Sequence, residues 1–170
     1  MKMLSQRYDF LFQKTNMKLL ILALLILLDF LSKKVIFHFV ELNKLISLVS
    51  FIDITHIQNY GISFGLFAGI LPMWLIVLLG VIMIFILFFW MFKTSNKLGK
   101  WGLLLVISGG ISNIGDRLIN NYVLDFIFLH YKQHYWPAFN FADIYISVGV
   151  LLIIIENYMI FRARIKDKND

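Results

Sequence analysis

The stretch from Ile70 to Phe92 contains no charged residue, and as a helix it is long enough to cross the ~30 Å hydrocarbon core of a bilayer. In the whole chain, 60% of the 170 residues are hydrophobic and only 15% are charged. That is more apolar side chain than a single globular core would bury. Cysteine is absent, which excludes a disulfide framework, a thiolate metal site and a cysteine nucleophile. We therefore expect a small polytopic membrane protein.

Four membrane spans can be drawn, and together they make residues 1–170 a single membrane domain. Their approximate bounds are 19–37, 70–92, 101–118 and 137–161. The last span is expected to begin at Pro137, because proline is favoured at the first position of a helix. Between the first two spans, isoleucines alternate with polar residues over 52–58, and a turn signal follows at Asn59–Gly61. This pattern predicts a small strand-rich cap within residues 39–69.

Basic residues indicate the orientation of the spans. Eleven of the 16 Lys and Arg residues fall on one side, namely Lys2, Arg7, Lys14, Lys18, Lys93, Lys97, Lys100, Arg162, Arg164, Lys166 and Lys168. Cytoplasmic segments carry such an excess, so both termini are expected in the cytoplasm. The net charge of +6 is therefore interpreted as a topology signal and not as a sign of nucleic-acid binding. Residues 38–69 and 119–136 are expected on the opposite side.

Three polar clusters at the edges of apolar helices each carry an aspartate, and these are Asp116, Asp125 and Asp143. A charge in the middle of a bilayer costs about 2.5–3.5 kcal/mol on insertion scales, so such residues are functional candidates by default. Aspartyl hydrolysis requires at least two carboxylates that come together, here at a membrane edge. The clusters therefore direct attention to acid–base chemistry on the outer face.

The fourth span carries the strongest of these candidates. Asp143 lies three residues after Asn140 and four before Ser147, so all three residues are expected on one helix face. A catalytic dyad and a packing or pump-like carboxylate both remain open for Asp143. Asp125, considered alone, is an ordinary aspartate of an outer loop.

The other polar groups have competing structural interpretations. Asp29 and Lys33 are four apart, and this spacing fits either a structural ion pair or a pair that positions substrate. Gly109 and Asn113 precede Asp116 and Arg117, and small residues and Asn favour close helix packing, so an architectural role is preferred for this acidic–basic pair. His130 and His134 also have i,i+4 spacing, but they lack the HExxH pattern of zinc proteases and lie among aromatic residues typical of a membrane interface.

Taken in order, these clusters resemble the lipoprotein signal peptidases (type II signal peptidases) of bacteria. The resemblance extends from Asp29 to about Gly149 and rests on five blocks. They are Asp29-Phe30-Leu31-Ser32-Lys33, Asn59-Tyr60-Gly61-Ile62-Ser63-Phe64-Gly65, Gly109 through Arg117, Val123-Leu124-Asp125-Phe126, and Phe139-Asn140-Phe141-Ala142-Asp143.

The resemblance implies an all-α integral membrane protein with four transmembrane helices, a small extracytoplasmic β-cradle and an outer loop between spans three and four. It implies an aspartyl endopeptidase that cleaves signal peptides from prolipoproteins immediately before a diacylglyceryl-modified cysteine. The catalytic pair of the family falls on Asp125 and Asp143. Positions that bind substrate or support the site fall on Asp29, Lys33, Asn59, Gly61, Gly109, Asn113, Asp116, Arg117, Asn140 and Ala142.

The resemblance also implies the setting of the enzyme. It requires no metal and no cofactor. The expected partners are diacylglyceryl-modified prolipoproteins and membrane lipid, without nucleic acid, and the chain is expected to act as a monomer. The expected location is the bacterial cytoplasmic (inner) membrane, with both termini in the cytoplasm and the active site at the extracytoplasmic face.

Some positions depart from the pattern of the family. The usual Gly-Gly-Ala-x-Gly-Asn block reads Ser108-Gly109-Gly110-Ile111-Ser112-Asn113, the usual Asn-x-Gly-Ala-Ala-Phe block contains the larger Ile62, and Phe30 follows the first aspartate in place of Gln. Two rival functions also remain. One is a small transporter or lipid-handling protein that needs Asp143 but not Asp125, and the other is a metal-dependent hydrolase that uses His130, His134 and Asp125.

Overall fold

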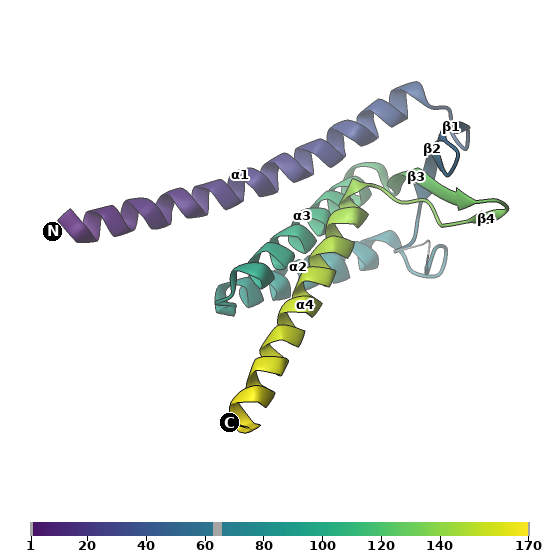
Figure 1. The fold of residues 1–170 in the computed structure, drawn as a ribbon. Coiled ribbons are helices and arrows are strands. Elements are labelled where there is room, and N and C mark those ends of the chain that lie inside the picture. Colours follow the sequence, from purple (N-terminus) through teal and green to yellow (C-terminus); the bar gives the residue numbers. More distant parts are fainter. Residues whose placement is uncertain (1, 63–65, 170) are drawn as a thin grey trace.

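The computed structural model describes the backbone of residues 2–62 and 66–169 and the side chains of residues 16–62 and 66–167. Ser63, Phe64 and Gly65 of the second block therefore lie outside the described residues. The elements follow in the order α1 (Lys2–Phe39), β1 (Leu45–Val49), β2 (Ile52–Asn59), α2 (Met73–Lys93), α3 (Lys97–Asn120), β3 (Val123–Tyr131), β4 (His134–Tyr135) and α4 (Phe141–Asn169). The strands lie together at one end of the helices, away from both termini (Figure 1).

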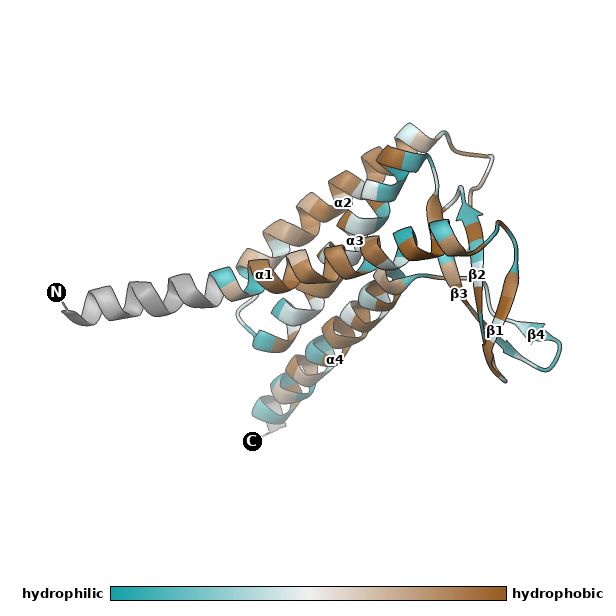
Figure 2. Cartoon of the chain, turned by 90° about the horizontal axis from the view of Figure 1, so that it is seen from above, coloured by the Kyte–Doolittle hydropathy of each residue, from teal (hydrophilic) through white to brown (hydrophobic). Residues whose placement is uncertain are grey.

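Three helices in the described residues are long and apolar enough to cross a membrane, namely α2, α3 and α4 as far as Asp167. Hydrophobic residues cover most of their length, and hydrophilic residues concentrate near the sheet and at the helix ends (Figure 2). The described part of α1 carries Lys18, Asp29, Lys33 and Lys34 within its apolar sequence. The described residues thus form four helices, and we still expect all four to cross the membrane.

The centre of the helical part is α3. In the most apolar 18-residue segment of each helix, 56% of α3 is buried, compared with 6% of α2 and 11% of α4. Helices α2 and α4 therefore direct most of their side chains outward. Where α3 crosses α4, a Cβ atom on Gly102 would lie only 2.7 Å from the carbonyl oxygen of Gly149. Nearer the sheet, a Cβ on Gly109 would overlap the carbonyl oxygen of Ala142. Small residues on α3 therefore allow the first turn of α4 to lie against it.

The sheet is antiparallel with the strand order β1-β2-β3-β4, and this arrangement corrects one expectation. The segment between α3 and α4 was expected to be an outer loop carrying Asp125, but it forms β3 and β4. Asp125 pairs with Ile57 of β2 across the sheet, and Val123 pairs with Asn59. The apolar residues around Asp125 are accounted for by this pairing, because Val123, Leu124 and Phe126 are all buried.

The start of α4 also differs from the expected Pro137, because the helix begins at Phe141. The chain before it is extended: Phe139 forms an isolated bridge with Ile127, and its backbone N–H donates to the carbonyl oxygen of Ile127 at 3.0 Å. This bridge fixes the start of α4 to β3. As a result, Asn140 is the residue immediately before the helix and not a member of it.

Candidate active site

Asn140 and Asp143 cap the amino terminus of α4 reciprocally. The backbone N–H of Asp143 donates to Asn140 Oδ1 at 3.0 Å, and the backbone N–H of Asn140 donates to Asp143 Oδ2 at 3.1 Å. This arrangement is a capping box, in which the residue before the helix and the third helical residue satisfy each other's backbone. The Asp143 carboxylate is consequently held at the positive end of the α4 dipole, where a negative charge is favoured.

The same Asn140 also holds the second carboxylate. Its Nδ2 atom donates to Asp125 Oδ1 at 2.7 Å, and Asn59 Nδ2 on β2 donates to Asp125 Oδ2 at 3.0 Å. Asn140 is completely buried and Asp125 is 3% exposed. One asparagine therefore bridges Asp125 and Asp143, which are 18 residues apart in the sequence.

The pKa of Asp125 is raised from its usual value of 3.8 to about 7, mainly by burial and in the same direction by the nearby charge of Asp143. The hydrogen bonds from Asn59 and Asn140, together with the positive charge of Lys33, oppose this rise in the pKa. Near neutral pH, Asp125 is therefore divided between its protonated and ionised forms. A carboxyl group in this state can donate a proton as well as accept one.

Asn113 on α3 supports Asp143 from the other side. Its Nδ2 atom donates to Asp143 Oδ1 at 2.9 Å, while its Oδ1 atom accepts from Lys33 Nζ at 3.0 Å. An ammonium group can only donate, so Lys33 fixes which end of the Asn113 amide faces Asp143. Lys33 therefore orients a contact of Asp143 without touching that carboxylate.

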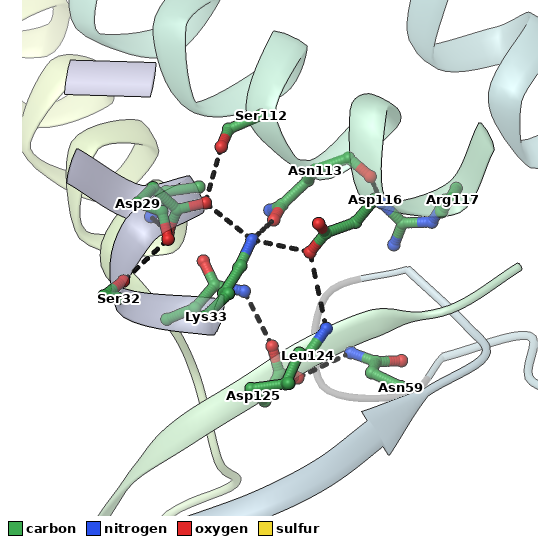
Figure 3. Close-up of polar contacts among 12 residues, drawn as sticks. Asp29, Ser32, Lys33, Asn59, Ser112, Asn113, Asp116, Arg117, Leu124 and Asp125 are labelled. Atoms are coloured by element: carbon green, nitrogen blue, oxygen red, sulfur yellow. Dashed lines mark hydrogen bonds and ion pairs between the residues drawn. The ribbon is translucent and has the colours of Figure 1, made fainter. Parts of the chain in front are cut away.

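Lys33 also binds two buried carboxylates, as Figure 3 shows. Its Nζ atom lies 2.7 Å from Asp29 Oδ2 and 2.9 Å from Asp116 Oδ2. The ion pair expected from the spacing of Asp29 and Lys33 is thus present. Asp116 Oδ2 in turn accepts a long hydrogen bond of 3.5 Å from the backbone N–H of Leu124, which precedes Asp125 on β3. The ionic cluster therefore links α1 and α3 to the strand that carries Asp125.

Arg117 connects α3 to the segment that follows β2. Its Nη1 atom donates to the carbonyl oxygen of Asn113 at 3.0 Å, and its Nη2 atom donates to the carbonyl oxygen of Gly61 at 2.6 Å. The backbone N–H of Gly61 donates to Asn59 Oδ1 at 2.9 Å, which leaves Asn59 Nδ2 directed to Asp125. The turn signal at Asn59–Gly61 therefore corresponds to a side chain–backbone turn that aims an amide at the candidate dyad.

The Asp29 carboxylate contacts α3 and the first turn of α4 and not the dyad. Its Oδ1 atom accepts from the backbone N–H of Ala142 in the first turn of α4 at 2.9 Å, and its Oδ2 atom accepts from Ser112 Oγ at 2.5 Å. Ser112 is the functional candidate that the sequence did not identify, because it stood out only as a departure from the family pattern. Its position one residue before Asn113 was the available signal.

A cavity of about 860 Å³ opens beside the two carboxylates. Its polar lining includes Asp125, Asp143, Asn59 and Arg117. Ile62, which stands where the family pattern has alanine, also lines the cavity. Most of the rest is apolar, and α2, α3 and α4 contribute many of its side chains, among them Leu79, Met83, Leu87 and Val106. The cavity thus joins a paired carboxylate site to an apolar space within the helices, an arrangement suited to a substrate that is partly peptide and partly membrane-embedded.

The two histidines do not join this site. His130 Nε2 lies 3.4 Å from Asp53 Oδ2, and His134 is exposed in β4. Within residues 16–62 and 66–167, no group of three or more His, Cys, Asp or Glu residues is placed to hold a metal ion. The described donor set therefore offers no support for the metal-dependent rival.

Comparisons with a protein family and with individual proteins give the same kind of enzyme. Residues 21–159 match the family described as signal peptidase (SPase) II. The lipoprotein signal peptidase of Teredinibacter turnerae is 39% identical over 137 residues, which cover 77% of this chain and 80% of that protein. The lipoprotein signal peptidase of Thermodesulfovibrio yellowstonii is 35% identical over 135 residues, which cover 79% of this chain and 89% of that protein.

A solved structure described as a bacterial membrane enzyme is similar in fold. It superposes with a TM-score of 0.78 at 25% sequence identity, and the match covers 85% of this chain and 88% of the other. The arrangement of helices and the small sheet is therefore shared with a known membrane enzyme.

Proposed function

Since this chain belongs to the signal peptidase II family, we propose that Asp125 and Asp143 are the catalytic pair with which it removes signal peptides from prolipoproteins. The chain is a membrane protease, and the family implies an aspartyl mechanism. The observation that carries the assignment is the bridge through Asn140, which donates to Asp125 and is in a capping box with Asp143. A transporter that relied on Asp143 alone would have no need for this bridge.

The proposed mechanism divides the work between the two carboxyl groups. Protonated Asp125 donates a hydrogen bond to the scissile carbonyl, and ionised Asp143 takes a proton from the attacking water. The water oxygen bonds to the carbonyl carbon and forms a tetrahedral intermediate. A proton then passes to the leaving amine as the C–N bond breaks, and the pair returns to a single shared proton. The helix terminus at Asp143 and the raised pKa of Asp125 both support this division.

The proposed substrate lies along the cavity. Its scissile bond reaches the polar end beside the dyad, and its apolar part occupies the space between α2, α3 and α4. We propose that the cleaved bond immediately precedes the diacylglyceryl-modified cysteine, so that lipid and signal peptide both remain in the membrane during the reaction. The supporting site residues act by fixing the dyad: Asn59, Asn113 and Asn140 contact it directly, and Lys33, Asp29, Asp116 and Arg117 hold those contacts in place.

The raised pKa of Asp125 predicts how activity depends on pH. Its acidic form predominates below about pH 7 and is lost as the pH rises through that value. We therefore expect kcat/KM for a lipid-modified prolipoprotein to fall about tenfold per pH unit above the apparent pKa of the pair. The measurement is kcat/KM from pH 5 to 9 in one detergent, with enzyme folding checked at each pH. A flat profile from pH 6 to 9 would contradict the roles assigned to the two carboxyl groups.

We propose a topology with four spans, both termini in the cytoplasm and the dyad at the extracytoplasmic face. The basic residues support it, although the side chains of Lys2, Arg7, Lys14 and Lys168 lie outside the described residues. Both termini also lie away from the sheet (Figure 1). Reporter fusions after residues 96 and 170 should report the cytoplasm, and a fusion after Lys132 should report the outside. A cytoplasmic signal at Lys132 would place the aspartates in the wrong compartment.

A further inference from the structure

Ser112 is a buried hydroxyl on α3, at a position where the family pattern quoted above has glycine. The residue is 7% exposed, and its Oγ atom donates to Asp29 Oδ2 at 2.5 Å (Figure 3). A serine hydroxyl has one proton to donate, so this contact uses it fully. The hydroxyl therefore belongs to the ionic cluster of the site and not to the backbone of its own helix.

The two oxygens of Asp29 have different partners. Oδ2 accepts from Ser112 and pairs with Lys33, while Oδ1 accepts from the backbone N–H of Ala142. Lys33 gives one of its three donors to Oδ2, and the other two go to Asp116 and Asn113. The second donor on Oδ2 holds the carboxylate plane so that Oδ1 faces Ala142.

That hydrogen bond reaches the catalytic carboxylate through one turn of helix. Ala142 immediately precedes Asp143, and its N–H is one of the amides at the start of α4 that lack a partner within the helix. Two consecutive residues of α3 therefore hold this turn in place: Asn113 donates to Asp143 directly, and Ser112 acts through Asp29 and Ala142. Without the serine, the first turn of α4 keeps only one of these two supports in full.

We propose that Ser112 is a positioning residue for the reaction, which holds Asp143 in its catalytic geometry by fixing the Asp29 carboxylate against the first turn of α4. This inference rests on the catalytic role of Asp143 proposed above. Ser112 does not line the cavity, and its hydroxyl donates to Asp29 and not to the dyad. Its effect is on the placement of the reacting carboxylate and not on substrate binding.

The test compares Ser112→Ala with Ser108→Ala in purified, folded enzyme. Ser108 is the matched control, because it is a completely buried serine one turn earlier on α3 whose hydroxyl donates to the backbone oxygen of Leu104. For Ser112→Ala we expect kcat to fall about tenfold, because small displacements of a reacting group are costly, while KM stays within about twofold. Ser108→Ala should leave both constants within about twofold of the wild-type values.

A double-mutant cycle with Asp29→Asn separates positioning from a general packing effect. If Ser112 acts through the Asp29 carboxylate, Ser112→Ala should lower kcat by less than about twofold in the Asp29→Asn background. A full tenfold loss in that background would overturn the proposal, as would an equal loss in Ser108→Ala. If Ser112→Ala does not accumulate, Ser112→Cys provides the same test, because it keeps the volume but is only a weak donor.

The experiment distinguishes failure of the positioning role from failure of the catalytic assignment. Wild-type kcat in Ser112→Ala, with Asp143→Asn inactive, would overturn the positioning role and leave the proposed function intact. Cleavage by Asp143→Asn itself would instead remove the proposed function on which this inference rests.

Discussion

Asp125→Asn and Asp143→Asn are each expected to lower the cleavage of a lipid-modified prolipoprotein by roughly a factor of 10³ or more. Asparagine has nearly the size and polarity of aspartate, but it can neither accept nor release the catalytic proton. Both oxygens of each aspartate accept hydrogen bonds, so in either variant the new amide NH2 faces a donor and one contact of the dyad is lost. Folding and insertion are therefore checked for both variants. The measurement is the rate of signal-peptide release by matched amounts of folded enzyme.

The double variant Asp125→Asn/Asp143→Asn should be hardly slower than either single variant, because residues that act as one unit lose their function together. Stability provides the control. The pKa of Asp125 is raised in the folded protein, so the stability associated with its protonation is lost as the pH rises through about 7. The stability of Asp125→Asn should therefore fall less between pH 6 and pH 8 than that of the wild type. Substantial turnover by Asp125→Asn would favour a mechanism centred on Asp143 alone.

Lys33→Met is expected to have the largest effect on stability. Lys33 is 4% exposed and lies between Asp29 and Asp116, which are 0% and 8% exposed. Removing the cation leaves two buried carboxylates without their common partner, and breaking a buried ion pair in this way costs about 3–5 kcal/mol. Activity should fall as well, because Asn113 loses the donor that fixes its orientation toward Asp143. The measurement is thermal or denaturant unfolding in detergent micelles, together with kcat.

Lys34→Met provides a matched control on the same helix. Lys34 is exposed, and its ammonium group lies 5.4 Å from the centroid of the Phe30 ring. Its replacement should change stability by no more than about 0.5 kcal/mol. Replacing Lys33, Asp29 and Asp116 together by Met, Asn and Asn should recover part of the stability but not the activity, because the charge imbalance is removed and the orientation of Asn113 is not restored. Equal stability of Lys33→Met and Lys34→Met would contradict the role given to the ionic cluster.

Local spacing predicted the parts of the site that lie on one helix. The i,i+4 pair of Asp29 and Lys33 is present, and Asp143 and Ser147 both line the cavity. Such contacts depend only on the helical repeat, which sequence patterns report directly. The capping box at α4 is equally local, but its capping residue was expected inside a helix beginning at Pro137. The bridge between Phe139 and β3 keeps those residues extended instead.

Contacts between distant segments were not accessible in this way. The residues around Asp125 do not distinguish it from an ordinary loop aspartate, because nothing near it in the sequence indicates that β3 pairs with β2. The pKa of Asp125 is raised by its burial and by the nearby charge of Asp143, and both conditions arise only in the folded protein. The same limitation applies to Ser112, whose partner Asp29 is 83 residues away. Strand register and helix packing determine these contacts, and a single sequence does not report either.

The most direct test of the catalytic assignment is digestion of a diacylglyceryl-modified prolipoprotein by purified wild-type, Asp125→Asn and Asp143→Asn enzymes, with both products identified by mass spectrometry. The wild type should make one cut, immediately before the modified cysteine, and neither variant should make it. Cleavage of that bond by both variants at rates near that of the wild type would contradict a catalytic role for the two aspartates.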